Sequence, residues 1–394
     1  MKIQLKLLTF AIMGCSVLAG PDNDISYPDE YLADLARNYS EGHQSPIEAV
    51  NALASERGIT ALHAAVELGF VSLAQEMLSR GVDVNACDES GWTALMSACC
   101  DLSEHESSTV MALVQMLLNN GANVDAKDQD GATALMMTHY PEVLSVLIKH
   151  GANINETDDM GQTALMHTVR RNEMWSGYDY CFERAHLLIQ NGANVNIKTK
   201  EGKTVLMYAV DAAPTPEGIE PKVFELLLEK GIRIDTQDQD GCTALMYAAS
   251  YNSPEAVGLL LKHGANVDVR DAHGRTALFY AFLLQNKFVK DLAAEPDTLF
   301  EYIPAEHHFL SAELLIENGA SVNAQDSLGQ TALHVEVKEG NISAVQFLLN
   351  HGADPRIKDS QGRTAFDLAA SDDMKKAFNR THTSSEHDNA KPAK

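Results

Sequence analysis

The sequence predicts an all-α protein, a solenoid of about nine stacked helix–turn–helix units with projecting loops. The first observation behind this prediction is a pattern, Gly-x-Thr-Ala-Leu or a close variant, that recurs along the 394-residue chain. The second is its spacing, because successive threonines of the pattern lie 33, 40, 30, 41, 39, 33, 55 and 33 residues apart. The third is a run of apolar residues at helical spacing between the copies. A 33-residue unit with insertions therefore repeats through most of the chain.

The unit that starts at Thr243 shows why each element is expected. Thr243 can cap a first helix that begins at the next residue, because its side-chain oxygen can accept a backbone N–H. Ala248 and Ala249 are small and let a second helix pack closely against the first. The second helix is expected to end at Gly264, since glycine adopts the positive φ that often follows a helix. The polar segment 266–276 is rich in Asp and Gly and predicts a projecting loop.

These units resemble the ankyrin repeat, and the resemblance covers about residues 58–378. The chain departs from the Thr-Pro-Leu-His motif of that family, because alanine replaces the proline in most units. Histidine remains only at His63 and His334, and methionine stands in its place at Met96, Met136, Met166, Met207 and Met246. The resemblance implies a non-enzymatic module that binds other proteins through the concave face of its first helices and its loop tips.

Shorter segments flank and interrupt the repeats. Residues 20–57 are expected to form a linker and a helical N-terminal cap, in which Ser45-Pro46-Ile47-Glu48 is a capping box. Residues 379–394 are polar and predict a disordered tail. Four insertions, at 101–109, 172–182, 212–221 and 285–308, are expected between the two helices of their units.

The N-terminal residues 1–19 have the features of a bacterial export signal. Lys2 and Lys6 precede an apolar stretch, Leu7–Met13, that is too short to span a bilayer. Two alternatives stay open: cleavage after Ala19, or a lipoprotein signal that ends before Cys15, which would then carry the lipid. The sequence thus predicts a periplasmic protein, either free or anchored as a lipoprotein, with secretion as the alternative. No later segment has the length and apolar character of a transmembrane helix.

Composition excludes several functional classes. The formal net charge is −25, which opposes binding to the phosphates of nucleic acid. Twelve of the acidic residues occupy recurring repeat positions, and setting them aside leaves 43 acids against 30 bases. About half of the acidic excess is therefore attributed to loop chemistry. The chain also lacks Gly-x-Ser-x-Gly, His-Glu-x-x-His and zinc-type cysteine spacing, so we expect no enzyme activity, cofactor or bound metal. We expect the protein to be a monomer.

Aromatic and basic residues indicate a candidate partner-binding surface, because Tyr, Trp and Arg are frequent at binding hot spots. Trp92, Lys203, Arg275 and Arg363 are expected at loop tips. The candidate contact residues are Trp92, His167, Arg170, Arg171, Tyr208, Tyr247, Tyr251 and Tyr280 in the repeats, and Trp175 and Tyr178 in the insertion at 172–182. The structural alternative is that the tyrosines pack against the next repeat and that Trp92 contacts the neighbouring loop.

Three functional hypotheses follow from the sequence. The first is an exported, non-enzymatic protein that binds a protein partner and inhibits or escorts an enzyme or toxin. The second is a lipid-anchored protein that organises the envelope. The third is a metal- or small-molecule-dependent activity built on the insertions, and a secreted ankyrin effector directed at a host is a further variant. The sequence does not identify the partner.

Overall fold

The computed structural model describes residues 58–100, 107–170, 181–211, 221–282 and 309–380, together with Ala54. The chain divides into two compact units, residues 1–200 and 201–394, and each is described by itself. Within the described residues the regular elements are helices, and extended pairing is limited to isolated bridges such as Cys87 with Thr93. This agrees with the predicted all-α repeat fold. The signal segment, the cap at 20–57 apart from Ala54, and most of the tail lie outside the described residues.

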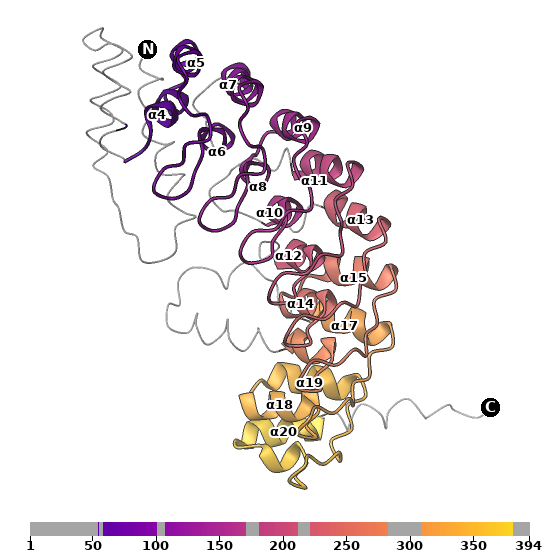
Figure 1. The fold of residues 1–394 in the computed structure, drawn as a ribbon. Helices are drawn as coiled ribbons and strands as arrows, with labels where there is room; N and C mark the ends of the chain where they lie inside the picture. Colours follow the sequence, from indigo (N-terminus) through magenta and orange to yellow (C-terminus); the bar gives the residue numbers. More distant parts are fainter. Residues whose placement is uncertain are drawn as a thin grey trace, which may run out of the picture. The chain divides into compact units, whose positions relative to one another are not determined.

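The N-terminal unit is built from successive pairs of antiparallel helices. The pairs are α4 (Ala61–Glu67) with α5 (Val71–Ser79), α6 (Ala94–Cys99) with α7 (Ser107–Asn119), α8 (Ala134–Met137) with α9 (Pro141–Lys149), and α10 (Ala164–Val169) with α11 (Cys181–Gln190). The first helices of the pairs pack on one another in one row, and the second helices form a parallel row (Figure 1). Loops project from the row of first helices (Figure 1).

The C-terminal unit repeats this arrangement. Its elements are α12 (Val205–Asp211), α13 (Pro221–Glu229), α14 (Ala244–Ser250), α15 (Pro254–Lys262), the helical residues 277–282, α17 (Leu310–Glu317), α18 (Ala332–Glu339), α19 (Ile342–Asn350), the 3₁₀ turn η4 (Phe366–Leu368) and α20 (Asp372–Arg380). Helix α20 continues to Arg380, beyond the expected end at 378. The insertions follow α6, α10, α12 and residues 277–282, which places each between two helices of a pair, and their central residues lie outside the described ranges.

The threonine caps the first helix as the sequence predicts in α4, α6, α10 and α14, whereas the Thr133 side chain makes no cap bond and the Thr276 hydroxyl has no hydrogen-bond partner. In α6 the Thr93 hydroxyl accepts the N–H of Met96 at 3.4 Å, and the Met96 sulfur accepts the N–H of Thr93 at 3.4 Å. The leucine two residues after the threonine is buried in each complete first helix, as Leu95 and Leu245 show. This leucine, with the apolar face of the second helix, forms the core between neighbouring pairs.

Histidine and methionine act differently at the third helical position. The Nδ1 atom of His63 lies 2.7 Å from the Thr60 hydroxyl, and its Nε2 atom lies 2.9 Å from the Trp92 carbonyl in the next repeat. His334 makes the same pair of contacts, to Thr331 and to the Arg363 carbonyl. Met96, Met207 and Met246 keep only the contact within their own repeat, through the threonine N–H. These methionines therefore lack the hydrogen bond that histidine makes to the next repeat.

Backbone hydrogen bonds also join the tips of consecutive loops. In the C-terminal unit the N–H of Ala272 donates to Asp240 at 2.9 Å, and the N–H of Ser327 donates to His273 at 2.8 Å. Gly274 lies at this contact with a φ of 78°, and a Cβ atom there would stand 2.9 Å from the Ser327 nitrogen. Glycine is required at this point for both its conformation and its lack of a side chain.

In the part of the chain that the structure describes, no helix has the length and apolar character needed to cross a membrane.

Candidate partner-binding face

The candidate face is the side of each unit that carries the first helices and the loop tips, and we call it the first-helix face. An aspartate fixes the shape of each loop on this face. The Oδ1 atom of Asp238 accepts the N–H of Asp240 at 3.0 Å and that of Cys242 at 2.8 Å. The same two bonds, to the second and fourth following residues, are formed by Asp88, Asp128, Asp158, Asp271, Asp326 and Asp359. Each carboxylate therefore has its second oxygen available for another group.

That second oxygen binds several of the predicted contact residues. The Tyr247 hydroxyl donates to Oδ2 of Asp238 at 2.7 Å, and the Tyr280 hydroxyl donates to Oδ2 of Asp271 at 2.7 Å. In the N-terminal unit, Nε2 of His167 lies 2.8 Å from Oδ2 of Asp158. The polar ends of these three side chains are thus held by their own repeats, which is a role that the sequence analysis did not assign. A partner would meet their partly exposed rings.

The chemistry of the two tyrosines follows from this environment. Burial raises the pKa of Tyr247, and the neighbouring Asp238 carboxylate raises it further. Burial likewise raises the pKa of Tyr280, whose hydroxyl also lies 3.1 Å from the Cys242 sulfur. Both hydroxyls therefore stay protonated at neutral pH and act as hydrogen-bond donors.

A loop tip of one repeat contacts the tyrosine of the next repeat. The Cys242 sulfur approaches Tyr280 in this way, and the Lys203 ammonium stands 5.4 Å from the ring centroid of Tyr247. Lys203 also lies 6.0 Å from the ring of Tyr208, within the range of a cation–π contact. Tyr208 itself is only 8% exposed, so its ring offers little surface to a partner.

Arg275 is the exception to this pattern. It stands at the tip of the loop before residues 277–282. In the next repeat, which begins with α18, Val335 occupies the slot held by tyrosine in the two preceding repeats and offers no polar group. The carboxylate of Arg275's own loop, Asp271, already accepts from Tyr280. The Arg275 Nε atom is buried without a hydrogen-bond partner, and no described carboxylate forms an ion pair with this residue. The guanidinium is a cation on the first-helix face with unused donors.

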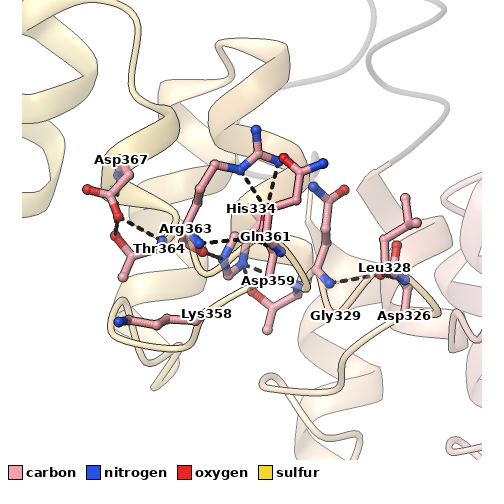
Figure 2. Close-up of polar contacts among 12 residues, drawn as sticks. Asp326, Leu328, Gly329, His334, Lys358, Asp359, Gln361, Arg363, Thr364 and Asp367 are labelled. Carbon is pink, nitrogen blue, oxygen red and sulfur yellow. Dashed lines mark hydrogen bonds and ion pairs between the residues drawn. The ribbon is translucent and has the colours of Figure 1, made fainter.

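Arg363 occupies the same loop position and behaves differently. Its Nε and Nη2 atoms donate to Oδ2 of Asp359 at 3.0 and 2.8 Å (Figure 2). The slot filled by tyrosine elsewhere holds Leu368, so the Asp359 carboxylate is available to the arginine. The Arg363 guanidinium lowers the pKa of Asp359 to about 2.

Trp92 lies at the tip of its loop. Its backbone N–H donates to Asp88 at 2.8 Å, and its carbonyl lies 2.9 Å from Nε2 of His63 in the preceding repeat. Burial raises the pKa of Asp128 in the next loop, and the N–H groups of Ala132 and Asp130 act in the opposite direction. The Trp92 ring is partly buried and keeps some exposed surface.

The other predicted contact residues are at the margin of the face or beyond the described ranges. Arg170 is exposed at the end of α10, and Tyr251 is partly buried at the end of α14. Arg171, Trp175, Tyr178 and the possible lipidation site Cys15 lie outside the described residues.

About half of the acidic excess is explained by the loops. The twelve repeat acids are Asp83, Asp88, Asp125, Asp128, Asp158, Asp235, Asp238, Asp268, Asp271, Asp326, Asp354 and Asp359. All but Asp268 accept at least one backbone N–H through their carboxylates. These carboxylates serve the scaffold by holding loop backbone, as their recurring positions predicted.

The described residues contain no group of three or more His, Cys, Asp or Glu side chains placed to hold a metal ion.

The comparisons with known proteins agree with the fold. A family model described as ankyrin repeats (3 copies) matches residues 41–110, 105–183 and 212–299. A second model, described as ankyrin repeats (many copies), matches residues 315–369. The search of curated proteins found no match.

Proposed function

Because the chain belongs to the ankyrin repeat family, whose repeats are generally protein–protein interaction modules, we propose that it binds a protein partner through its first-helix face. Proteins of this family are typically non-enzymatic. The observation that carries the proposal is Arg275, whose buried Nε atom has no hydrogen-bond partner, in a repeat whose loop carboxylate is already used by Tyr280. Arginine and tyrosine are both frequent at binding hot spots.

The tyrosines support the same proposal by being preorganised. The bonds from Tyr247 and Tyr280 to loop carboxylates hold both rings in place before a partner arrives. Binding of a partner therefore costs little conformational entropy in these two side chains. In the N-terminal unit, His167 is held in the same manner by Asp158.

Site-specific photocrosslinking tests the choice of surface. A photoreactive amino acid replaces His273, which is exposed at a loop tip, or Glu255, which is exposed on the second helix α15. We expect covalent capture of a protein partner in cell-envelope extract from position 273 and none from position 255. Capture from position 255 alone would assign binding to the second helices and contradict the proposal.

We further propose that the protein acts in the bacterial periplasm. The support is the sequence of the first nineteen residues, with Lys2 and Lys6 before an apolar stretch. The lipobox-like Ile12-Met13-Gly14-Cys15 favours a lipid-anchored form, in which the protein organises the envelope, as the second candidate function. Cell fractionation with palmitate labelling separates the two: a Cys15→Ala variant that leaves both the label and the membrane fraction unchanged would exclude the anchored form.

A further inference from the structure

The residue just before the glycine of each loop forms the tip of that loop and is exposed wherever the structure describes it. Polar or charged side chains occupy this position at Ser90, Asp130, Glu201, Asp240, His273 and Gln361. The exceptions are Met160 in the N-terminal unit and Leu328 in the C-terminal unit, which are 50% and 56% exposed. These are the two most exposed large apolar side chains among the described residues. An apolar side chain at such a tip gains free energy when a partner covers it.

Leu328 lies on the loop that adjoins the loop of Arg275. The N–H of Ser327 donates to the carbonyl of His273 at 2.8 Å, and a Cβ atom on Gly274 would stand 2.9 Å from the Ser327 nitrogen. Arg275 and Leu328 directly follow the residues that make this contact. A cation and an exposed apolar side chain therefore stand on neighbouring tips of the C-terminal unit.

The backbone of both residues is fixed at its donor and at its acceptor. The Arg275 N–H donates to Oδ1 of Asp271 at 2.7 Å, and the Arg275 carbonyl accepts the N–H of Asp271 at 2.9 Å. The Leu328 N–H donates to Oδ1 of Asp326 at 2.9 Å (Figure 2), and the Leu328 carbonyl accepts the N–H of Ser360 at 2.9 Å. The two tips are thus preorganised, which lowers the entropy that a partner must overcome.

The carboxylates of these two loops are used by the scaffold. Asp271 accepts backbone N–H groups through Oδ1 and the Tyr280 hydroxyl through Oδ2. Asp326 accepts two N–H groups of its own loop through Oδ1. The Arg275 guanidinium forms no hydrogen bond or ion pair with another described residue, and its Nε atom is buried. A partner therefore meets this cation through its Nη groups, whose planar arrangement matches the two oxygens of a carboxylate.

We propose that Arg275 and Leu328 form one recognition site for a segment of another protein in which an acidic side chain stands beside an apolar one. The proposal rests on the function proposed above and names the class of partner. The carboxylate pairs with the Nη groups of Arg275, and the apolar side chain covers Leu328. Because this chain has a net charge of −25, long-range repulsion disfavours highly acidic partners and favours an isolated carboxylate next to an apolar residue.

Selection from a phage-displayed library of random dodecapeptides on the immobilised full chain tests the class of partner. We expect the enriched peptides to share an Asp or Glu close in sequence to Leu, Ile, Met or Phe. Enriched peptides without an acidic residue would overturn the proposal, and so would a library that yields no peptide preferring the wild type over Arg275→Met.

Isothermal titration of the best enriched peptide separates the two contacts. Arg275→Met, and replacement of the peptide's acidic residue by its amide, should each weaken binding by about tenfold or more. The two changes together should weaken it no further than either alone, because they remove the same contact. Leu328→Gln should weaken binding several-fold. Met160→Gln is the matched control and should leave the affinity unchanged, because Met160 is a similarly exposed apolar tip in the other unit.

Fully additive losses in the double variant, or equal losses in Leu328→Gln and Met160→Gln, would contradict the proposal. Capture of a partner by photocrosslinking from position 273, together with an unchanged peptide affinity of Arg275→Met, would refute this class of partner and leave protein binding intact. Analytical ultracentrifugation of the free chain should show a monomer. Self-association that Arg275→Met abolishes would assign the site to a second copy of this chain and overturn the proposal.

Discussion

Two loops of the C-terminal unit share a motif but use it differently. The loop at 271–275 and the loop at 359–363 both have the pattern Asp-x-x-Gly-Arg, and in both the aspartate accepts the same two backbone N–H groups. In the first loop Tyr280 takes the remaining carboxylate oxygen, and Arg275 is left without a partner for Nε. In the second loop Arg363 takes that oxygen.

The difference originates in one position of the first helix. Tyr280 reaches back to the loop carboxylate across nine residues, whereas Leu368 at the equivalent position cannot. A single residue type on the helix therefore decides whether the loop arginine is part of the scaffold or is available to a partner. The same loop motif can be structural in one repeat and functional in another.

The largest effect is expected from Asp271→Ala. This change removes the acceptor for the N–H groups of His273 and Arg275 and for the Tyr280 hydroxyl. Buried donors without acceptors are costly, so we expect a loss of about 3 kcal/mol in the free energy of unfolding. Urea denaturation measures it, with Asp268→Ala as control, because Asp268 is exposed and accepts no backbone N–H. Equal losses in the two variants would show that the carboxylate does not hold the loop.

Glycine substitutions in the two loops come next. Gly274 and Gly362 have nearly the same φ, 78° and 77°, but only Gly274 faces the backbone of a following loop. Gly274→Ala should cost about 2–3 kcal/mol of stability, whereas Gly362→Ala should cost about 1 kcal/mol, from conformation alone. The difference between the two midpoints of denaturation measures the loop-to-loop contact. Identical midpoints would mean that the loops do not approach as closely as the structure shows.

The ion pair between Asp359 and Arg363 in the second loop leads to a prediction about how stability depends on pH. The pKa of Asp359 is lowered to about 2 by Arg363, so the folded state favours the ionised form. Its contribution to stability is full above the ordinary carboxyl pKa near 4 and is lost as the pH falls toward 2. A carboxyl-detected NMR titration should give the low pKa in the wild type and a value near the ordinary one in Arg363→Met. An Asp359 pKa that stays equally low in Arg363→Met would show that Arg363 does not cause the shift.

The smallest effect on folding is expected from Arg275→Met. The Arg275 Nε atom has no partner to lose, so the free energy of unfolding should change by less than about 0.5 kcal/mol. Chemical denaturation of Arg275→Met and Arg363→Met, each against the wild type, compares the two losses of stability. A large loss of stability in Arg275→Met would show that the arginine is part of the scaffold after all.

Local rules predicted much of this molecule. Each Thr-Ala-Leu begins a helix, as Thr93 and Thr243 do, and the repeat aspartates bind backbone N–H groups, because these effects depend on residues only a few positions apart. The bond between Tyr280 and Asp271 was missed, although its spacing of nine residues recurs for Tyr247 and His167 and was a usable signal. The burial of the Arg275 Nε atom could not have been found, since it depends on how neighbouring repeats pack and not on its neighbours in sequence.

The central claim is that Arg275 is available to a partner whereas Arg363 is part of the scaffold. The most direct test is the affinity with which the photocrosslinked partner binds variants of these two arginines. Surface plasmon resonance would compare Arg275→Met and Arg363→Met with the wild type. We expect at least tenfold weaker binding for Arg275→Met and a change of less than about twofold for Arg363→Met, since loss of a buried hot-spot arginine costs more than about 1.4 kcal/mol. Equal affinities for both variants, or a larger loss for Arg363→Met, would contradict the claim.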